Sequence, residues 1–300
     1  MLLQLLYRSP LFEPDLGAVR PAWRRTKAQR RRTIVVAAIL LCAVALVLGI
    51  GFGVMLFLTR DSASPYRVSQ ALSQFKLLQA RDRVVGAAAG LPLPGVYTYL
   101  TKGSESASAP GLLTSASSYP ATSAMTVYSK GCGQEWRWQP LSNRYENLVL
   151  CRAKSGAVML LSRFDADQFY GVMDARLFSC TSGSSWLPAR PRTGSKLSGS
   201  CVNGGNKNSG GMTISYTGEV VASDPVVVGG KSVPAVHVVL DEKFTGDTAG
   251  TGNVSMWLDS STGLLLKENR TEVSKSKSVI GWVPSTETFS LELASLSPKQ

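Results

Sequence analysis

The chain has 300 residues, of which 44% are hydrophobic and 17% are charged, and its formal net charge is +12. Lysine and arginine number 32 against 20 aspartates and glutamates, and the 28 glycines and 15 prolines are spread along the chain. This composition excludes an acidic disordered tail and a collagen-like repeat, and it supplies enough apolar residues for a hydrophobic core.

Residues 34–58 contain no charged side chain and are predicted to form a transmembrane helix. Twenty-five residues make a helix roughly 37 Å long, enough to cross a ~30 Å hydrocarbon core. The apolar region of a signal peptide is shorter, about 7–15 residues, so we expect an uncleaved anchor. Cys42 lies inside the run and lacks the small residues that precede an acylated lipoprotein cysteine.

A basic flank predicts the orientation of this anchor. Seven Lys and Arg residues lie between Arg20 and Arg32 with no acidic residue among them. By the positive-inside rule, residues 1–33 form a cytoplasmic tail and residues 59–300 lie outside the cell membrane. Anionic lipid headgroups account for the basic run, so we expect the bilayer as a partner and no nucleic acid.

The stretch from Tyr66 to Val85 is predicted to be an amphipathic helix, because its apolar residues recur at three- and four-residue intervals. Such a helix either packs on the following domain or binds a partner. Glycines and prolines between Gly86 and Pro94 end it. Residues 59–90 are therefore predicted to be a membrane-proximal helix and linker, and residues 91–300 the extracytoplasmic domain.

Past Pro94 the pattern predicts a mainly antiparallel, β-rich α+β domain, because short runs of β-branched and aromatic residues alternate with turns. Segments 103–119 and 194–211 are rich in Ser, Ala and Gly and are predicted to be loops. A hairpin is expected with its turn at Gly229-Gly230. The predicted strands are 96–100, 125–128, 145–150, 157–161, 212–216, 226–228, 233–240, 253–258, 264–273, 279–282 and 286–293.

Four cysteines outside the anchor predict two disulfides, since their number is even and the compartment is oxidising. Four cysteines allow three pairings. We favour Cys132–Cys151 and Cys180–Cys201, because each pair is adjacent in sequence and the first brackets a predicted hairpin. Zinc is the rival interpretation, but the spacings are long, and we expect no metal and no cofactor.

The sequence contains no recognisable catalytic constellation, so we expect no enzyme activity. His237 is the only histidine and lies within an apolar strand. Both the Gly-x-Ser-x-Gly motif and the phosphate-binding glycine loop are absent. The most distinctive segment contains Trp136 and Trp138, which project to one face of a strand. That pair either packs in the core or forms the wall of a ligand pocket.

One hairpin carries a family resemblance. Residues 257–267 read Trp-Leu-Asp-Ser-Ser-Thr-Gly-Leu-Leu-Leu-Lys: a strand ending in Trp-x-Asp, a Thr-Gly turn and an apolar strand. Over about residues 212–293 this resembles the lipoprotein-carrier half-barrel superfamily, which includes periplasmic lipoprotein carriers and lipid-binding envelope lipoproteins. The basic N-terminus, the single span and the Gly-Cys-Gly…Arg-Trp-x-Pro-Leu segment at 131–141 are similar to single-pass envelope proteins of actinobacteria.

The resemblance implies a curved half-barrel whose concave side holds an acyl chain or another apolar ligand. The first hypothesis is therefore a membrane-anchored module that binds a lipid or hydrophobic ligand in the cell envelope, with Trp136, Trp138 and Trp257 as candidate ligand-binding residues. The alternative is a sensory or protein-interaction ectodomain with a membrane-protein partner, and a hydrolase is a third. A large empty apolar pocket would favour the first hypothesis, and a packed core the second.

Overall fold

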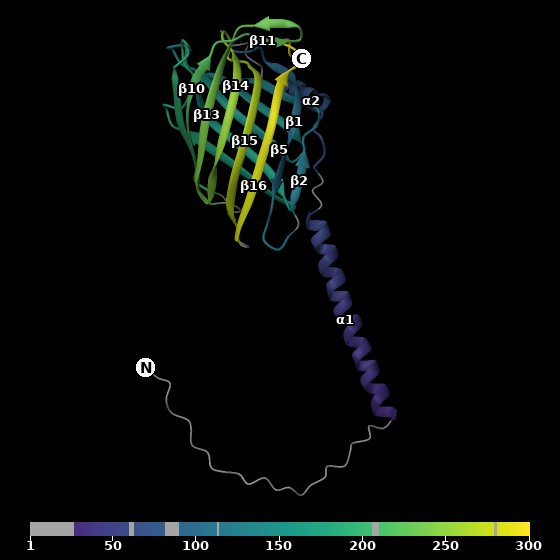
Figure 1. Ribbon diagram of the computed structural model, residues 1–300. Helices are drawn as coiled ribbons and strands as arrows, with labels where there is room; N and C mark the ends of the chain where they lie inside the picture. The colour runs from purple at the N-terminus through teal and green to yellow at the C-terminus, as the bar shows by residue number, and fades with distance from the viewer. Residues whose placement is uncertain (1–26, 60–62, 82–89, 113, 206–209, 279–280) are drawn as a thin grey trace, which may run out of the picture. The chain divides into compact units, whose positions relative to one another are not determined.

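The computed structural model describes residues 27–59, 63–81, 90–112, 114–205, 210–278 and 281–300 (Figure 1). The chain divides into two compact units, Met1–Gly53 and Val54–Gln300. All described strands, both disulfides and both clusters of buried apolar side chains lie between Ala63 and Gln300. The core of the barrel is therefore formed within this part of the chain.

Helix α1, Lys27–Thr59, contains the predicted segment 34–58. Among the described residues, the structure has no helix that is long and apolar enough to cross a membrane, so the predicted span is not supported by it. Residues 1–26 of the predicted cytoplasmic tail lie outside the described residues, as do 60–62 and 82–89 of the predicted linker.

The predicted β-rich domain is confirmed as a closed antiparallel barrel. Its sheet includes fourteen of the described strands; β2 (Ser115–Ser118) and β8 (Ser185–Leu187) each pair on one side only, and the other twelve form the wall. In spatial order these are β1 (Gly95–Ala107), β3 (Thr122–Lys130), β4 (Gly133–Leu141), β5 (Arg144–Arg152), β6 (Val158–Phe169), β7 (Val172–Cys180), β9 (Lys196–Asn203), β10 (Met212–Ala222), β13 (Ala235–Gly246), β14 (Thr248–Asp259), β15 (Leu265–Ser278) and β16 (Gly281–Leu293).

The expected half-barrel is wrong in one respect, because the sheet has no open side. Strand β16 pairs with β1 from Tyr99 opposite Leu293 to Ala107 opposite Ser285. Closure joins strands almost two hundred residues apart and removes the free edges that an open sheet would expose.

Two predicted loops contain strands. Strand β1 continues to Ala107, and β2 follows at Ser115–Ser118, inside the segment predicted to be a loop at 103–119. Strand β9 lies within the predicted loop 194–211. Serine and glycine have low strand propensity, and here pairing with neighbouring strands overrides it.

The Gly229-Gly230 turn is confirmed, although its hairpin is shorter than predicted. Both glycines have positive φ, and they join β11 (Val226–Val228) to β12 (Lys231–Val233) in a small separate sheet. Pro234 follows β12, and β13 then begins at Ala235 in the main sheet. The predicted hairpin that contains Trp257 is confirmed as β14–β15, and residues 279–280 lie outside the described part.

Helix α2, Val68–Arg81, packs on the outside of the barrel, as one of the two interpretations of its apolar stripe predicted. Ala71 and Phe75 are buried against Val96 of β1 and Ala124 of β3. The Phe75 ring also lies 5.6 Å from that of Tyr128, measured between centroids. The helix therefore covers the wall beside β1 and β3.

Both predicted disulfides are confirmed, Cys132–Cys151 and Cys180–Cys201. The first closes the β4–β5 hairpin, whose strands share a long ladder. The second joins β7 to β9, where the described ladder has two residue pairs, Ser179–Val202 and Cys180–Cys201. The two disulfides indicate that the barrel matures in an oxidising, extracytoplasmic compartment.

The interior of the barrel has an apolar half and a charged half. Along β1, the inward side chains change from Tyr97 and Tyr99 to Glu105; along β16, which runs the other way, they change from Glu287 to Leu293. The apolar half therefore surrounds the start of β1 and the end of β16. A barrel of twelve strands is wider than one that short apolar side chains fill, and the long side chains of Glu, Asp and Arg residues fill its other half.

Candidate functional site

Thirteen charged side chains face the interior of the charged half, nine of them acidic and four basic. Alternation along each strand places them there, and four of the acids, Glu105, Glu146, Glu242 and Glu268, are at most 7% exposed. The full set is Glu105 on β1; Arg144 and Glu146 on β5; Arg163, Asp165 and Asp167 on β6; Asp174 and Arg176 on β7; Glu242 on β13; Glu268, Arg270 and Glu272 on β15; and Glu287 on β16.

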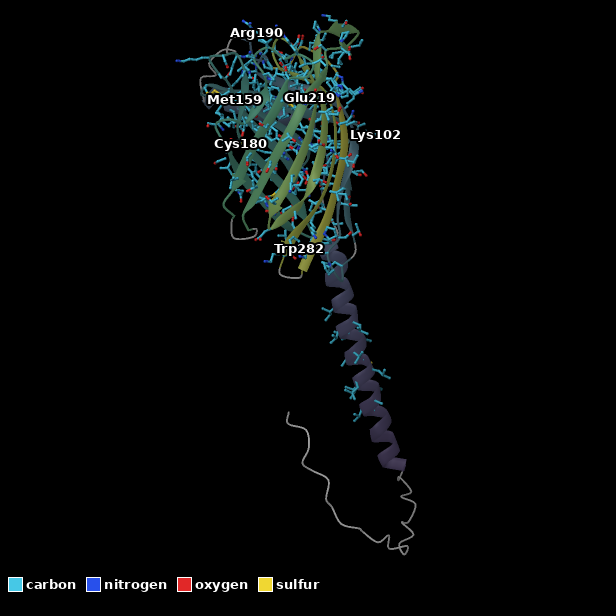
Figure 2. The ribbon with its side chains drawn as sticks, turned by 60° about the vertical axis from the view of Figure 1, so that its left-hand side comes forward. Lys102, Met159, Cys180, Arg190, Glu219 and Trp282 are labelled. Carbon is cyan, nitrogen blue, oxygen red and sulfur yellow. A yellow bond between two sulfur atoms is a disulfide. The ribbon has the colours of Figure 1, made fainter. Side chains whose placement is uncertain are left out.

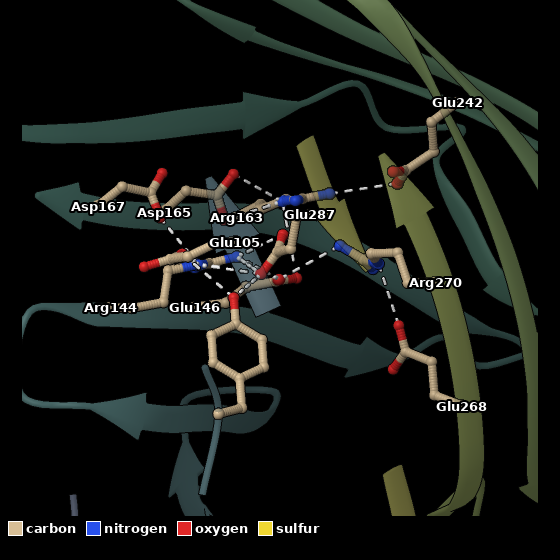
Figure 3. A network of polar contacts seen from close by, with 11 residues as sticks. Glu105, Arg144, Glu146, Arg163, Asp165, Asp167, Glu242, Glu268, Arg270 and Glu287 are labelled. Atoms are coloured by element: carbon tan, nitrogen blue, oxygen red, sulfur yellow. Dashed lines mark hydrogen bonds and ion pairs between the residues drawn. The ribbon is translucent and has the colours of Figure 1, made fainter. Parts of the chain in front are cut away.

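Arg144 is the centre of one group of ion pairs. Its guanidinium lies 2.8 Å from Asp167 and 3.1 Å from Glu287, and it also approaches Glu105 at 3.6 Å (Figure 3). The Tyr119 hydroxyl lies within hydrogen-bonding distance of Glu105, at 3.1 Å, and of Glu287. This group joins β5 and β6 to β1 and β16 across the interior, beside the β1–β16 closure of the barrel.

Glu146 is the centre of a second group. Its carboxylate lies 3.3 Å from Arg270 and 3.6 Å from Arg163, and Arg144 is 4.0 Å away. Arg163 in turn pairs with Asp165 at 2.9 Å and with Glu242 at 3.2 Å, and Arg270 pairs with Glu268 at 3.1 Å (Figure 3). One carboxylate thus lies among three buried guanidiniums, each of which also pairs with another acid.

Burial and neighbouring charges shift the pKa values of the interior acids in opposite directions. Burial raises the pKa of Glu146, but Arg163, Arg270 and Arg144 outweigh it and lower that pKa to about 2. Burial raises the pKa of Glu105 to about 8 and that of Glu268 to about 7. Burial, reinforced by Glu287, raises the pKa of Glu272 to about 8.

A row of three glutamates explains part of the raised pKa values. Glu105 lies directly opposite Glu287 across β1 and β16, and Glu287 lies directly opposite Glu272 across β16 and β15. Like charges directly opposite one another repel, and Arg144 pairs with two of the three. Repulsion along this row therefore adds to burial in raising the pKa values of Glu105 and Glu272.

Two small cavities lie where the apolar and charged halves meet. One, of about 30 Å³, is lined by Trp136, Trp138 and Phe289 together with Glu268. The other, of about 20 Å³, is lined by Arg163, Tyr216 and Glu242 among others. Their walls share Glu146, Leu148, Trp186 and Arg270. A buried water needs about 10–15 Å³, so each cavity has room for one or two water molecules.

The structure brings together two of the three tryptophans predicted to bind a ligand. Trp136 and Trp138 are buried side by side in the wall of the larger cavity, as their two-residue spacing predicted. The Trp138 ring packs 4.5 Å from that of Phe289, measured between centroids, and its indole N–H donates to Ser123 at 2.9 Å.

Trp257 lies elsewhere, on the outer face of β14. Its ring stacks on the His237 ring at a centroid distance of 4.0 Å, and the Lys267 ammonium lies 5.4 Å from the Trp257 centroid. The Nε2 atom of His237 is 2.7 Å from the Ser255 hydroxyl oxygen. His237 and Trp257 are thus packed as a surface pair, away from the interior cavities.

None of the thirteen interior charges was among the site residues predicted from the sequence. A signal was present, because Arg163, Asp165 and Asp167 alternate along one strand, and Glu268, Arg270 and Glu272 along another. Among the described residues, no group of three or more His, Cys, Asp or Glu side chains is arranged to hold a metal ion.

Comparison with known proteins shows no family. Neither a family model nor a curated protein matches the sequence. Among solved structures, a similar one is that of the hypothetical lipoprotein YmcC from Escherichia coli, at 14% sequence identity and a TM-score of 0.31. The match covers 79% of this chain and 98% of that protein. The resemblance to the lipoprotein-carrier superfamily stays a prediction.

Proposed function

We propose that the barrel is an extracytoplasmic recognition module of the cell envelope that binds its partner on the outer surface. One observation carries this proposal: the two cavities found between the apolar and charged halves are too small for an acyl chain. Pockets that bind small molecules measure about 300–1,000 Å³, whereas the two interior cavities measure about 30 and 20 Å³. An acyl chain would have to displace the buried ion pairs of Arg144, Arg163 and Arg270.

The cost of such displacement also supports the proposal. Breaking a buried ion pair and leaving one partner uncompensated costs about 3–5 kcal/mol. The Glu146 carboxylate lies within 4.0 Å of three guanidiniums, so a ligand that separated them would break several buried pairs. The lipid-carrier hypothesis therefore becomes the alternative, to be distinguished by experiment.

We further propose that residues 34–58 anchor the module in the cell membrane, with residues 1–33 in the cytoplasm. The support is the 25-residue uncharged run and its basic flank. Protease treatment of intact spheroplasts tests the orientation: the barrel should be accessible, and an epitope fused at the N-terminus should be protected. Digestion of that epitope in intact spheroplasts would overturn the orientation.

A binding role also agrees with the position of the single histidine. His237 lies on the outer face, stacked on Trp257 and paired with the Ser255 hydroxyl, and it borders neither interior cavity. This position therefore gives no support to the hydrolase hypothesis, whose only histidine candidate is His237.

Native mass spectrometry of residues 63–300, purified from an oxidising compartment, tests the filled interior. We expect the mass of the polypeptide with its two disulfides and no adduct. A stoichiometric lipid-sized adduct, identified after solvent extraction, would overturn the proposal and establish the ligand-binding alternative. Because this segment omits residues 34–58, lipid retained by the anchor cannot confuse the result.

A further inference from the structure

The barrel separates its charges between inside and outside. Residues 91–300 contain sixteen acidic and nineteen basic side chains, so the sequence alone indicates a mildly basic domain. Nine of the acidic side chains but four of the basic ones face the interior. Lys207 lies outside the described residues, and the described outer surface is left with fourteen basic and seven acidic side chains. Folding thus produces a surface with a twofold excess of positive charge.

Part of the excess positive charge lies on two neighbouring loops, at the end of the barrel where the interior is apolar. One loop, 153–157, joins β5 to β6, and the other, 188–195, joins β8 to β9. Their bases are tied where Val158 pairs with Leu187, and a methyl group on Gly156 would lie 3.7 Å from the Ala189 Cβ atom. The loops and the end of β5 carry four basic side chains and no acidic one, which we call the basic rim patch: Arg152, Lys154, Arg190 and Arg192.

Three members of the basic rim patch are free to bind. Lys154, Arg190 and Arg192 are exposed and form no ion pair with any described residue. Arg190 lies at one end of the barrel in Figure 2, the end opposite Trp282. Arg152 supports the loop from below, because its guanidinium donates to the carbonyl oxygen of Gly156 at 2.9 Å and to that of Gly90.

We propose that the basic rim patch binds a polyanionic chain of the cell envelope, one that carries repeated phosphate or carboxylate groups. This inference rests on the proposed function, because it supplies the partner for the outer surface. Guanidinium groups pair with phosphate and carboxylate in a bidentate manner, and unpaired surface cations attract a polyanion over a Debye length of about 8 Å at physiological salt.

The composition of the two loops favours a polymer over a protein or a bilayer surface. Protein interfaces are centred on aromatic and aliphatic anchors, and peripheral membrane binding uses apolar side chains that enter the headgroup region. Loops 153–157 and 188–195 are fully described and expose Lys, Arg, Ser, Thr, Ala and Gly, with no large apolar side chain among them. Charge is therefore the recognition chemistry that this surface offers.

Matched variants of residues 63–300 test the proposal. The patch variant is K154Q/R190Q/R192Q, and the control is K243Q/K275Q/K277Q, which removes three exposed lysines elsewhere on the outer surface. Both variants have the same net charge. The probe is fluorescently labelled inorganic polyphosphate, with binding followed by anisotropy at several salt concentrations. Thermal unfolding of both variants verifies that each is folded.

We expect the patch variant to bind at least tenfold more weakly and the control to bind within about twofold of the parent. The patch variant lacks three cations that pair with phosphate. The slope of the logarithm of its association constant against the logarithm of salt concentration should therefore be less negative by roughly two. Equal weakening in both variants would mean that net charge alone binds the probe, and unchanged binding in both would place the site elsewhere. Each result would overturn the proposal.

A second arm distinguishes the source of the anion. Vesicles of phosphatidylglycerol and phosphatidylcholine should bind the parent more weakly than polyphosphate does; a patch-dependent preference for vesicles over polyphosphate would overturn the polymer in favour of the membrane surface. The filled-barrel proposal fails separately, through a lipid adduct in the mass spectrum. The two proposals can therefore be refuted independently.

Discussion

Replacing Glu105 with glutamine should stabilise the barrel by an amount that grows with pH. Glu105 is 3% exposed, and burial together with the Asp167 and Glu287 carboxylates raises its pKa to about 8, against an ordinary value of 4.5. Below pH 4.5 the carboxyl is protonated in both the folded and the unfolded states and contributes no pH dependence. Between pH 4.5 and 8 the unfolded state loses its proton first, so the folded state becomes progressively less favoured.

The magnitude follows from the difference between the two pKa values. One pKa unit corresponds to about 1.36 kcal/mol, so the parent loses about 1.4 kcal/mol of stability per pH unit, and about 4–5 kcal/mol by about pH 8. Glutamine does not titrate and keeps an oxygen that accepts from the Tyr119 hydroxyl. The gain in unfolding free energy of E105Q over the parent should therefore rise with that slope.

Urea unfolding of residues 63–300 at pH 5, 6, 7 and 8 measures this difference, with the m-value monitored for two-state behaviour. The control is E292Q, since the Glu292 side chain is 55% exposed and pairs with Lys267 at the surface. Its effect should stay within about 0.5 kcal/mol at every pH. A constant E105Q effect across the four pH values would refute the assignment of a proton to this buried carboxyl.

Three other changes test separate parts of the fold by chemical denaturation. E146A should destabilise by about 3–5 kcal/mol because three guanidiniums lose their shared carboxylate, whereas E292A should cost under about 1 kcal/mol; equal effects would contradict the central position of Glu146. C180S/C201S should cost about 3 kcal/mol and increase amide exchange across the β7–β9 seam, and unchanged exchange there would contradict the proposed role of this disulfide. F75A should cost about 3–5 kcal/mol, since the ring is fully buried beneath α2; a loss under about 1 kcal/mol would mean that α2 does not pack there.

Features that depend on nearby residues could be predicted from the sequence. The apolar spacing around Phe75 located α2, and the cysteines that flank a hairpin identified the Cys132–Cys151 pair. The common facing of Trp136 and Trp138 follows from the two-residue period of a strand. Each of these inferences uses a local period or a short separation, which is independent of how the sheet closes.

Closure of the barrel could not be predicted, because it pairs Tyr99 with Leu293 and no local pattern fixes such a contact. The interior ion network depends on that closure. Alternating charges at Glu268, Arg270 and Glu272 indicate one face of a strand, but in an open sheet a charged face lies in water. In this barrel the charged face points inward. Because most of the inward side chains are acidic, the outer surface is more basic than the net charge of the sequence indicates.

A crystal structure of residues 63–300 at neutral pH is the most direct test of a filled interior. The account predicts that Arg144 contacts Glu287 and Asp167, that Arg270 contacts Glu146, and that the cavity beside Trp136 and Trp138 holds at most a few ordered waters. Continuous density for an elongated ligand through the barrel, with these arginines displaced from their partners, would contradict it.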